Sequence, residues 1–321
     1  MPKNRHITIT DVARAANVSR TLVSFVLTDR KEVAPATRAR ILQAIEELGY
    51  RPNSVARNLA TKRAGAIGIV CDMETYQDPL DMQFLAAILT TASEMEQRVM
   101  LIPSDDRRIQ EVAQDHAVDG IIFIDERVSD QRISHLLEMG LPAIGLWGDH
   151  IDAPLRQGLD ELALHLESRG LQHVVCLCGS CDKLFVTKFK QHLTATLQEY
   201  NIAPTVYHCP PDTETEAMQA VELALKRNRA TVIVASSDKL AINAIHALHA
   251  ARLQIPNDCA VTGFGDAPTA LWVQPTLTTI RVPVRAMALW AIDKVFKEEE
   301  TDKQQAQHPA VSYRLIVRRS C

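Results

Sequence analysis

The sequence predicts an α/β fold with two doubly wound parallel-sheet lobes, preceded by a small all-α head. Three observations support this prediction. Two short helical segments flank a tight turn near the N-terminus. After residue 64, short apolar runs alternate with helical segments, which is typical of a parallel, doubly wound sheet. A second series of the same kind begins after Pro154, so we expect two similar lobes with a cleft between them.

The head begins with two short helices. Thr10 is expected to cap the first helix, with Asp11 in its first turn, and Asn17 is expected to break it. Ser19 is expected to cap the second helix. Two short helices across a tight turn form the helix-turn-helix pattern.

The second helix has two different faces. At about 100° per residue, Leu22, Val23 and Val26 fall on one arc and are expected to face a core. The opposite arc carries the outward-facing residues Arg20, Thr21, Ser24 and Phe25. In a major groove an arginine can pair with guanine, and an aromatic edge can contact a thymine methyl group. This face favours the reading of double-stranded DNA over the alternative, a small solvated helical bundle.

Two more helices are expected after these, one in the head and one beyond it. One runs from about Pro35 and ends at Gly49, because glycine is a typical C-terminal stop. The other covers residues 53–60, and it is marginal because about eight residues cannot hold a helix alone in water. We expect it to form only against a partner, which makes it a candidate switch.

The head resembles the DNA-binding head of the lactose/galactose repressor family, in the words TITDVARAANVS, LVSFVL, TRARILQAIEELGYRPN and ARNLA. In that family the second helix lies in the major groove of an operator. The hinge helices of two subunits pair in the minor groove, where a leucine wedges between base pairs. The resemblance implies DNA contacts at Thr10, Ser19, Arg20, Thr21, Ser24 and Phe25 in the head and at Asn53, Ala56 and Leu59 in the hinge. Phe25 stands where the family often has arginine, which changes the operator sequence to be expected.

Charge is divided unevenly along the chain. Residues 1–63 hold 12 basic and 5 acidic side chains, although the whole chain has a net charge of −4. A basic head on an acidic body suits phosphate contacts confined to one end. The N-terminus lacks the apolar core of a signal peptide, and no apolar run is long enough to span a membrane. The seven cysteines are then expected to be reduced thiols in the cytoplasm.

The alternation of apolar runs and helical segments predicts the strands and helices of the body. Strands are expected at residues 66–70, 99–102, 120–124, 143–146, 173–178, 205–208, 231–235 and 260–264. Helices are expected between them, at residues 79–96, 109–116, 129–139, 158–168, 182–200, 213–227 and 239–251. The charged run 297–307 is expected to be a solvated loop.

The body resembles the periplasmic-binding-protein-like body of the same repressor family, in the pieces AIGIV, VDGIIFI, VASSDKLAINAIHAL and VTGFGDAPTALWVQPTLTTIRVP. In that family the chain crosses between the lobes three times, which here falls near Ala153, Val282 and Pro309. A helix at 284–299 would then belong to the first lobe and a final strand at 312–318 to the second. The implied organisation is a head at 1–51, a hinge helix and linker at 52–63, a first lobe at 64–153 plus 283–309, and a second lobe at 154–282 plus 310–321.

Ligands of open α/β lobes bind beyond the carboxyl ends of the strands. This rule points to the loops after Val70, Ile124, Leu146, Cys178, Ala235 and Phe264. The residues expected to contact a small-molecule effector are Asp78, Trp147, Lys188, Asp238 and Asp266. Trp147 has two possible roles, to stack on a sugar or base or to plug the space under the hinge. A sugar or sugar derivative is what the resemblance implies, although Lys188, Pro154 and Gly265 replace residues of the family's pocket.

Three cysteines lie close together in sequence, Cys176, Cys178 and Cys181. Their spacing resembles that of a metal or redox site. However, the first two are expected to point to one face of a strand, where small apolar cysteines are ordinary. A fourth zinc ligand could come only from the distant His208 or Cys209. We therefore expect no metal site and no cofactor.

These patterns, with the resemblance, predict a homodimeric transcription regulator, most simply a repressor, that binds a pseudo-palindromic DNA operator and responds to a small molecule in the cleft. No catalytic constellation is present, so an enzyme is not expected. A dimer is expected rather than a tetramer because no apolar heptad helix follows the last strand. Two alternatives remain open. One is a small-molecule binding or transport protein, which the body alone would favour. The other is a constitutive DNA-binding regulator whose ligand response is weak or lost.

Overall fold

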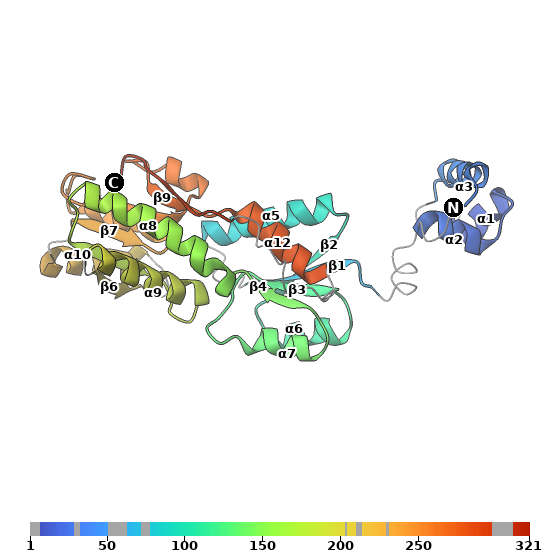
Figure 1. Cartoon of the computed structure of the whole chain (residues 1–321), viewed down its shortest axis with the longest axis horizontal. Helices are drawn as coiled ribbons and strands as arrows, with labels where there is room; N and C mark the ends of the chain where they lie inside the picture. The colour runs from blue at the N-terminus through green and yellow to red at the C-terminus, as the bar shows by residue number, and fades with distance from the viewer. Residues whose placement is uncertain are drawn as a thin grey trace, which may run out of the picture. The chain divides into compact units, whose positions relative to one another are not determined.

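The computed structural model describes residues 7–28, 33–50, 63–71, 78–202, 204–209, 214–228, 231–296 and 311–321 (Figure 1). The chain forms two compact units, Met1–Gly65 and Ala66–Cys321. The predicted hinge helix at 53–60, with Asn53, Ala56 and Leu59, lies outside the described residues. No helix in the described ranges is long and apolar enough to cross a membrane.

The first unit contains three helices, α1 (Ile9–Ala15), α2 (Arg20–Thr28) and α3 (Pro35–Leu48). They enclose a small core made of Val12, Ala13, Ala16, Val23, Val26, Ile41 and Ala44. The helix-turn-helix prediction is therefore confirmed. Gly49 ends α3 in the left-handed region, with φ of 63°, as its sequence position predicts.

One detail of the head prediction is wrong. Thr8, and not Thr10, is the N-cap of α1, and Thr10 lies inside the helix. The reason is the spacing of the capping box, in which an acceptor side chain follows the cap by three residues. Asp11 stands three residues after Thr8, and its carboxylate accepts hydrogen bonds from the Thr8 backbone N–H at 3.0 Å and from the Thr8 hydroxyl at 2.7 Å. Ser19 caps α2 as predicted, because its Oγ accepts from the Leu22 N–H at 3.2 Å.

The second unit contains two sheets. The first is parallel and has the strand order β2-β1-β3-β4. Its strands are β1 (Ala66–Cys71), β2 (Arg98–Pro103), β3 (Gly120–Phe123) and β4 (Ala143–Gly145). Its helices are α5 (Pro79–Glu94), α6 (Asp106–Gln114), α7 (Gln131–Glu138) and α12 (Val284–Phe296). Figure 1 shows α5 and α12 over one face of this sheet and α6 and α7 over the other.

The second sheet has the order β10-β9-β8-β7-β5-β6. Its strands are β5 (Val174–Cys178), β6 (Thr205–His208), β7 (Val232–Ala235), β8 (Ala260–Gly265), β9 (Thr278–Arg281) and β10 (Arg314–Ile316). Its helices are α8 (Asp152–Ser168), α9 (Leu184–Glu199), α10 (Glu214–Asn228) and α11 (Asp238–Ala250), with short 3-10 turns η1 (Asp149–Ile151) and η2 (Pro268–Leu271). Helices α8 and α9 pack against each other, as do α10 and α11.

Two features of this lobe differ from the prediction. Strand β9 was not expected, because its sequence TTIR has no apolar run, yet its first three residues are buried. It pairs in parallel with β8 and antiparallel with the edge strand β10, so the sheet is not wholly parallel. Helix α8 starts at Asp152 rather than at residue 158, because Pro154 is tolerated within a first helical turn.

Hydrophobic packing connects the two lobes of the body. One buried cluster includes Ile67 and Phe84 of the first lobe together with Phe189 and Phe264 of the second. Between them lies Trp147, whose ring contacts Phe84 edge-on at 5.2 Å and Phe185 at 4.5 Å between centroids. The cleft predicted between the lobes is therefore partly filled by aromatic side chains of the protein itself.

Candidate DNA-binding and ligand-binding sites

The outward face of α2 follows the predicted pattern at its amino end but not at Ser24 and Phe25. Arg20 and Thr21 are exposed, while Val23 and Val26 are buried in the core of the head. Ser24 and Phe25 are half-buried. Exposed polar side chains on a helix of this length are suited to the edges of bases in a major groove.

The remaining predicted DNA contacts lie elsewhere. Thr10 is exposed on α1, and Ser19 is exposed at the start of α2, where it serves as the cap. The structure therefore places Ser19, Arg20 and Thr21 in one exposed run at the amino end of α2. A helix amino terminus favours contact with phosphate groups.

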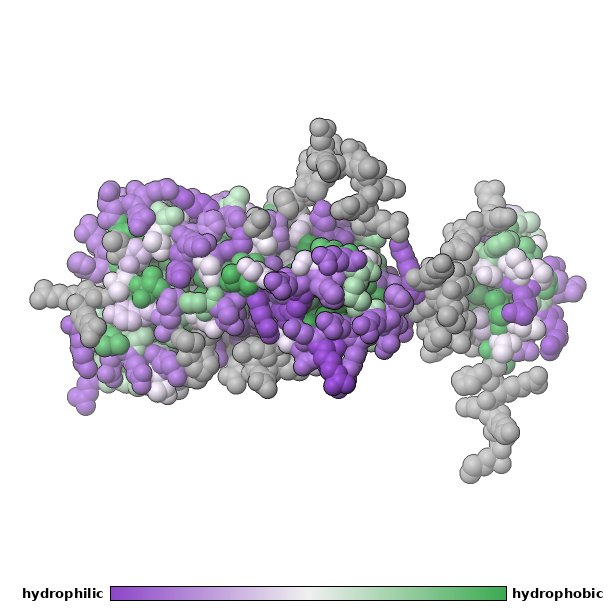
Figure 2. All heavy atoms as spheres, turned by 90° about the horizontal axis from the view of Figure 1, so that it is seen from below, coloured by the Kyte–Doolittle hydropathy of each residue, from purple (hydrophilic) through white to green (hydrophobic). Residues whose placement is uncertain are grey.

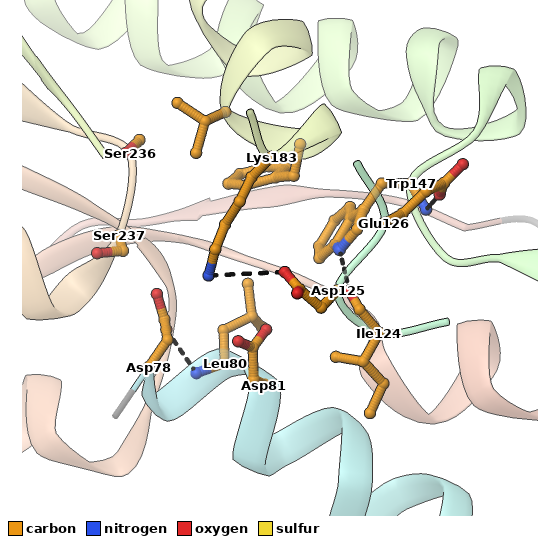
Figure 3. A pocket seen from close by; sticks show the side chains of 12 residues that line it. Asp78, Leu80, Asp81, Ile124, Asp125, Glu126, Trp147, Lys183, Ser236 and Ser237 are labelled. Carbon is orange, nitrogen blue, oxygen red and sulfur yellow. Dashed lines mark hydrogen bonds and ion pairs between the residues drawn. The ribbon is translucent and has the colours of Figure 1, made fainter. Parts of the chain in front are cut away.

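A pocket lies at the carboxyl ends of the strands of both lobes (Figure 3). Its lining comes from the start of α5, from the residues after β3, β4 and β7, and from the turn between β5 and α9. Five of the six loops expected to bind a ligand therefore contribute to it, those after Val70, Ile124, Leu146, Cys178 and Ala235. The pocket is small, about 40 Å³.

Asp78 lines this pocket from the first lobe. It is the N-cap of α5, where its Oδ1 accepts a hydrogen bond from the Leu80 N–H at 2.9 Å. Burial raises the pKa of the Asp78 carboxyl, although the positive charges of Lys183 and Lys239 act in the opposite direction. Asp78 therefore places a poorly solvated carboxylate at the amino end of α5.

Trp147 combines the two roles that its sequence position suggests. It lines the pocket, yet only 3% of its surface is exposed, and its Nε1 donates to the Ile124 carbonyl at 3.2 Å. Its backbone N–H donates to Glu126 at 2.9 Å. A Cβ at Gly145 would overlap the Glu126 carboxylate, so a larger residue there would displace this carboxylate from the Trp147 N–H. The tryptophan therefore forms a fixed wall.

Three of the predicted ligand residues are absent from the lining. Asp238 is 2% exposed, and its carboxylate accepts from the Thr279 hydroxyl at 2.5 Å and the Ala267 N–H at 2.7 Å. Its Oδ1 lies so close to Gly263 of β8 that a Cβ there would overlap it. The carboxylate therefore faces the sheet rather than the pocket. Burial raises the pKa of Asp238 to about 6.

Asp266 and Lys188 are likewise engaged within the protein. The carboxylate of Asp266 pairs with Arg281 at 2.6 Å and with Arg318 at 2.5 Å. Lys188 is buried on α9 and its ammonium pairs with Asp152 at 2.8 Å. These contacts indicate structural roles, which the sequence could not reveal because the partners lie far away along the chain.

Among the described residues, six polar residues of the pocket were missed by the sequence analysis: Asp81, Asp125, Glu126, Lys183, Ser236 and Ser237. Four of them directly follow a predicted strand, so the carboxyl-end rule could have identified them individually. Lys183 had no such signal. It reaches the pocket through a backbone contact between the lobes.

This contact joins residues 126–128 of the first lobe to residues 182–184 of the second. Arg127 and Lys183 form an antiparallel bridge. The Val128 N–H donates to the Asp182 carbonyl at 2.9 Å, and the Leu184 N–H donates to the Glu126 carbonyl at 3.0 Å. We call this pair of segments the latch, because it holds the two lobes together beside the pocket.

The cysteine cluster is divided between the interior and the surface. Cys176 and Cys178 are buried on one face of β5, with their sulfur atoms 3.3 Å apart, as the strand period predicts. Cys181 is exposed, and its sulfur lies 3.0 Å from His208 Nδ1. Within the described residues, no group of three or more histidine, cysteine or acidic side chains is arranged to hold a metal ion.

Comparison with known proteins finds a matching family model in each of the two units. Residues 8–53 match the family model described as bacterial regulatory proteins, lacI family, and residues 163–321 match that of a periplasmic binding protein-like domain. The chain therefore carries a head of the lacI family and a body of the periplasmic-binding-protein-like type. It is a DNA-binding transcription regulator with a ligand-binding type of body, as the sequence predicts.

Similar proteins cover nearly the whole of this chain. Catabolite control protein A of Priestia megaterium is 26% identical, covering 98% of this chain and 99% of its own length. The transcriptional repressor PurR of Photobacterium profundum is 25% identical, with 98% of each chain covered. Among solved structures, the Lac repressor dimer bound to operator and the anti-inducer ONPF has a TM-score of 0.80 at 22% identity, covering 98% of this chain and 99% of that one. The last likeness shows the shared fold.

Proposed function

We propose that this protein is a homodimeric repressor that binds a pseudo-palindromic operator and is modulated by a small molecule in the cleft of its body. The observation that carries this proposal is the outward face of α2, where Arg20 and Thr21 stand exposed on a helix fixed by its own core. Arg20, Thr21 and Phe25 would set the sequence preference. The other basic residues of the head would mostly set the affinity for phosphate.

The hinge completes the proposed DNA contact. Residues 52–63 would connect a head at 1–51 to the two lobes, with Asn53, Ala56 and Leu59 in the minor groove. A marginal helix forms only with a partner, so pairing of two hinges on DNA would depend on how the lobes of two subunits are spaced. A ligand that prefers one closure of the cleft would then change the affinity for the operator.

Exposed apolar side chains support a dimer. On the first lobe, the edge strand β2 exposes Met100 and Leu101, and the neighbouring α5 exposes Met82 and Leu89. On the second lobe, Trp272 is 76% exposed. By contrast, Figure 2 shows a face of the body on which hydrophilic residues predominate and hydrophobic areas are small. A second copy covering the apolar side chains would also pair or shield the open edge of β2.

The dimer can be tested by changing Trp272. Trp272→Ala should raise the monomer–dimer dissociation constant in sedimentation equilibrium and leave the unfolding of the monomer nearly unchanged. The exposed Leu223, on α10, offers a matched control as Leu223→Ala. Equal dimerisation of both variants would contradict this assignment of the interface.

A second candidate function is a constitutive regulator with a weak or lost ligand response. The size of the pocket favours it, because about 40 Å³ is far below the several hundred Å³ of ordinary ligand pockets. Both candidates bind DNA, and both place the protein in the cytoplasm. Only the ligand response distinguishes them.

Footprinting on the DNA around the protein's own gene tests the shared part of the proposal. We expect a protected pseudo-palindrome whose half-site centres are about one helical turn or more apart. Absence of any symmetric protection there and at other sites recovered from genomic DNA would contradict the proposal. A thermal-shift screen of small molecules then separates the two candidates, since a constitutive regulator responds to none.

A further inference from the structure

The pocket between the lobes has a strong excess of negative charge. Within the described part of the chain, its lining contains the carboxylates of Asp78, Asp81, Asp125 and Glu126 and one cationic side chain, Lys183. Figure 3 shows the Lys183 ammonium lying between the carboxylates of Asp78 and Asp125. Bringing carboxylates together away from water is unfavourable unless a cation accompanies them.

Lys183 supplies this cation from the opposite lobe. Its backbone belongs to the latch and follows β5 of the second lobe, whereas Asp78 and Asp125 belong to the first. The ammonium is 3.9 Å from Asp125 Oδ1, a longer separation than that of a close ion pair. The protein therefore places a tethered ammonium group among the carboxylates, on a backbone segment that the latch holds in position.

The rest of the lining is suited to the hydrocarbon part of a ligand. Trp147 and Phe185 pack against each other at 4.5 Å and form one wall, while Leu80, Ile124 and Val186 add apolar surface. Among the described residues of the lining, a phosphate or carboxylate ligand would meet four carboxylates and one ammonium. A neutral sugar that moved Lys183 aside would remove the ammonium that lies between Asp78 and Asp125.

We propose that the effector of this cleft carries an ammonium or amidinium group on a small hydrocarbon or aromatic frame, and that this group replaces the Lys183 ammonium beside Asp78 and Asp125. The inference rests on the proposed ligand-modulated function and names the class of its ligand. Because the pocket is about 40 Å³, the ligand enters only when Lys183 leaves and the lobes separate at the latch. Ligand binding and lobe opening are then one equilibrium, which gives the ligand a different affinity for the two states.

Chemical rescue tests this inference directly. Lys183→Ala removes the tethered ammonium but keeps the backbone hydrogen bonds of the latch. We expect n-butylammonium to raise the Tm of the full-length Lys183→Ala protein by several degrees. The neutral n-butanol and the anionic butyrate should have no such effect. The exposed Lys226, changed to alanine, is the matched control and should show no rescue.

A second variant identifies the site of rescue. Adding Asp125→Asn to Lys183→Ala should weaken the apparent affinity for n-butylammonium at least fivefold, because one carboxylate is lost. Equal Tm shifts with butanol, rescue that survives Asp125→Asn unchanged, or no rescue at all would overturn the inference. An operator footprint that n-butylammonium leaves unchanged, together with normal rescue, would instead contradict ligand control of DNA binding and leave the ligand class standing.

Discussion

The outward face of α2 and the pocket between the lobes are both suited to binding another molecule, but the first is open to solvent and the second is largely filled. The face of α2 comes from a single helix, and its residues Arg20 and Thr21 are exposed to solvent. The pocket comes from five segments of chain, and aromatic and charged side chains of the protein occupy much of it. The first surface can bind as it stands, whereas the second has to open. This difference is suited to a regulator, because a surface that must rearrange can change an equilibrium.

The largest expected effect concerns the aromatic packing between the lobes. Trp147→Ala should lower the free energy of unfolding of the body by about 3–5 kcal/mol, because a buried aromatic side chain is removed and a cavity remains. Urea unfolding monitored by circular dichroism measures this. The control is Leu223→Ala, which alters an exposed apolar side chain outside the proposed dimer surface. If Trp147→Ala were no more destabilising than Leu223→Ala, the aromatic side chains would not hold the lobes together.

The next effect concerns Asp238, a buried carboxylate that is absent from the lining of the pocket. In the folded protein its pKa is about 6, against about 4 in an unfolded chain. The folded state holds the proton more tightly, so the stabilisation is complete below about pH 4 and is lost as the pH rises through 6. The difference corresponds to about 3 kcal/mol as an upper bound.

Asp238→Asn imitates the protonated form and should remove this dependence. Between pH 4 and 7, the unfolding free energy of the unaltered protein should fall by up to about 3 kcal/mol more than that of the variant. Urea titrations at several pH values measure both. Parallel pH profiles would show that Asp238 does not carry the effect.

The same comparison explains what the sequence could predict. The faces of α2, the caps at Ser19 and Gly49 and most strands of the body follow from local patterns, because period, capping and turn chemistry act over a few residues. Thr8 and Thr10 are both residues that can cap a helix, and the spacing to Asp11 distinguishes them.

The pocket was predicted at the level of loops and not of most individual residues. Strand ends identify where a ligand binds, since all parallel strands end at the same edge of a sheet. They do not identify which side chains turn inward. Asp238 turns toward Thr279, and Lys183 arrives through a contact between segments more than fifty residues apart along the chain. Such pairings depend on the assembled fold.

A smaller effect is expected at the DNA-reading face. Arg20→Ala should relax the preference at one base pair of each half-site by about 1–3 kcal/mol. Fluorescence anisotropy with operator variants measures the change. Arg14, which is exposed on α1, gives a matched control as Arg14→Ala and should lower affinity evenly across sequences. Uniform loss of affinity with Arg20→Ala would remove this residue from base reading.

The smallest effect concerns the capping box that holds α1 in place. Asp11→Ala should lower the free energy of unfolding of the head by about 1 kcal/mol, because the hydrogen bonds to Thr8 are lost. Thermal unfolding of the full chain, followed by hydrogen exchange of the α1 amides, measures this. Thr10→Ala serves as the comparison and should have less effect. The reverse order would restore Thr10 as the cap.

The central claim is that an exposed helix face in the head reads DNA for a two-fold symmetric regulator. Selection of bound sequences from a random double-stranded DNA pool tests this claim most directly, with the unaltered protein and the Arg20→Ala, Thr21→Ala double variant side by side. The account predicts an inverted repeat for the unaltered protein and loss of information at matching positions in both half-sites for the variant. Selection of no symmetric sequence, or of the same sequence by both proteins, would contradict it.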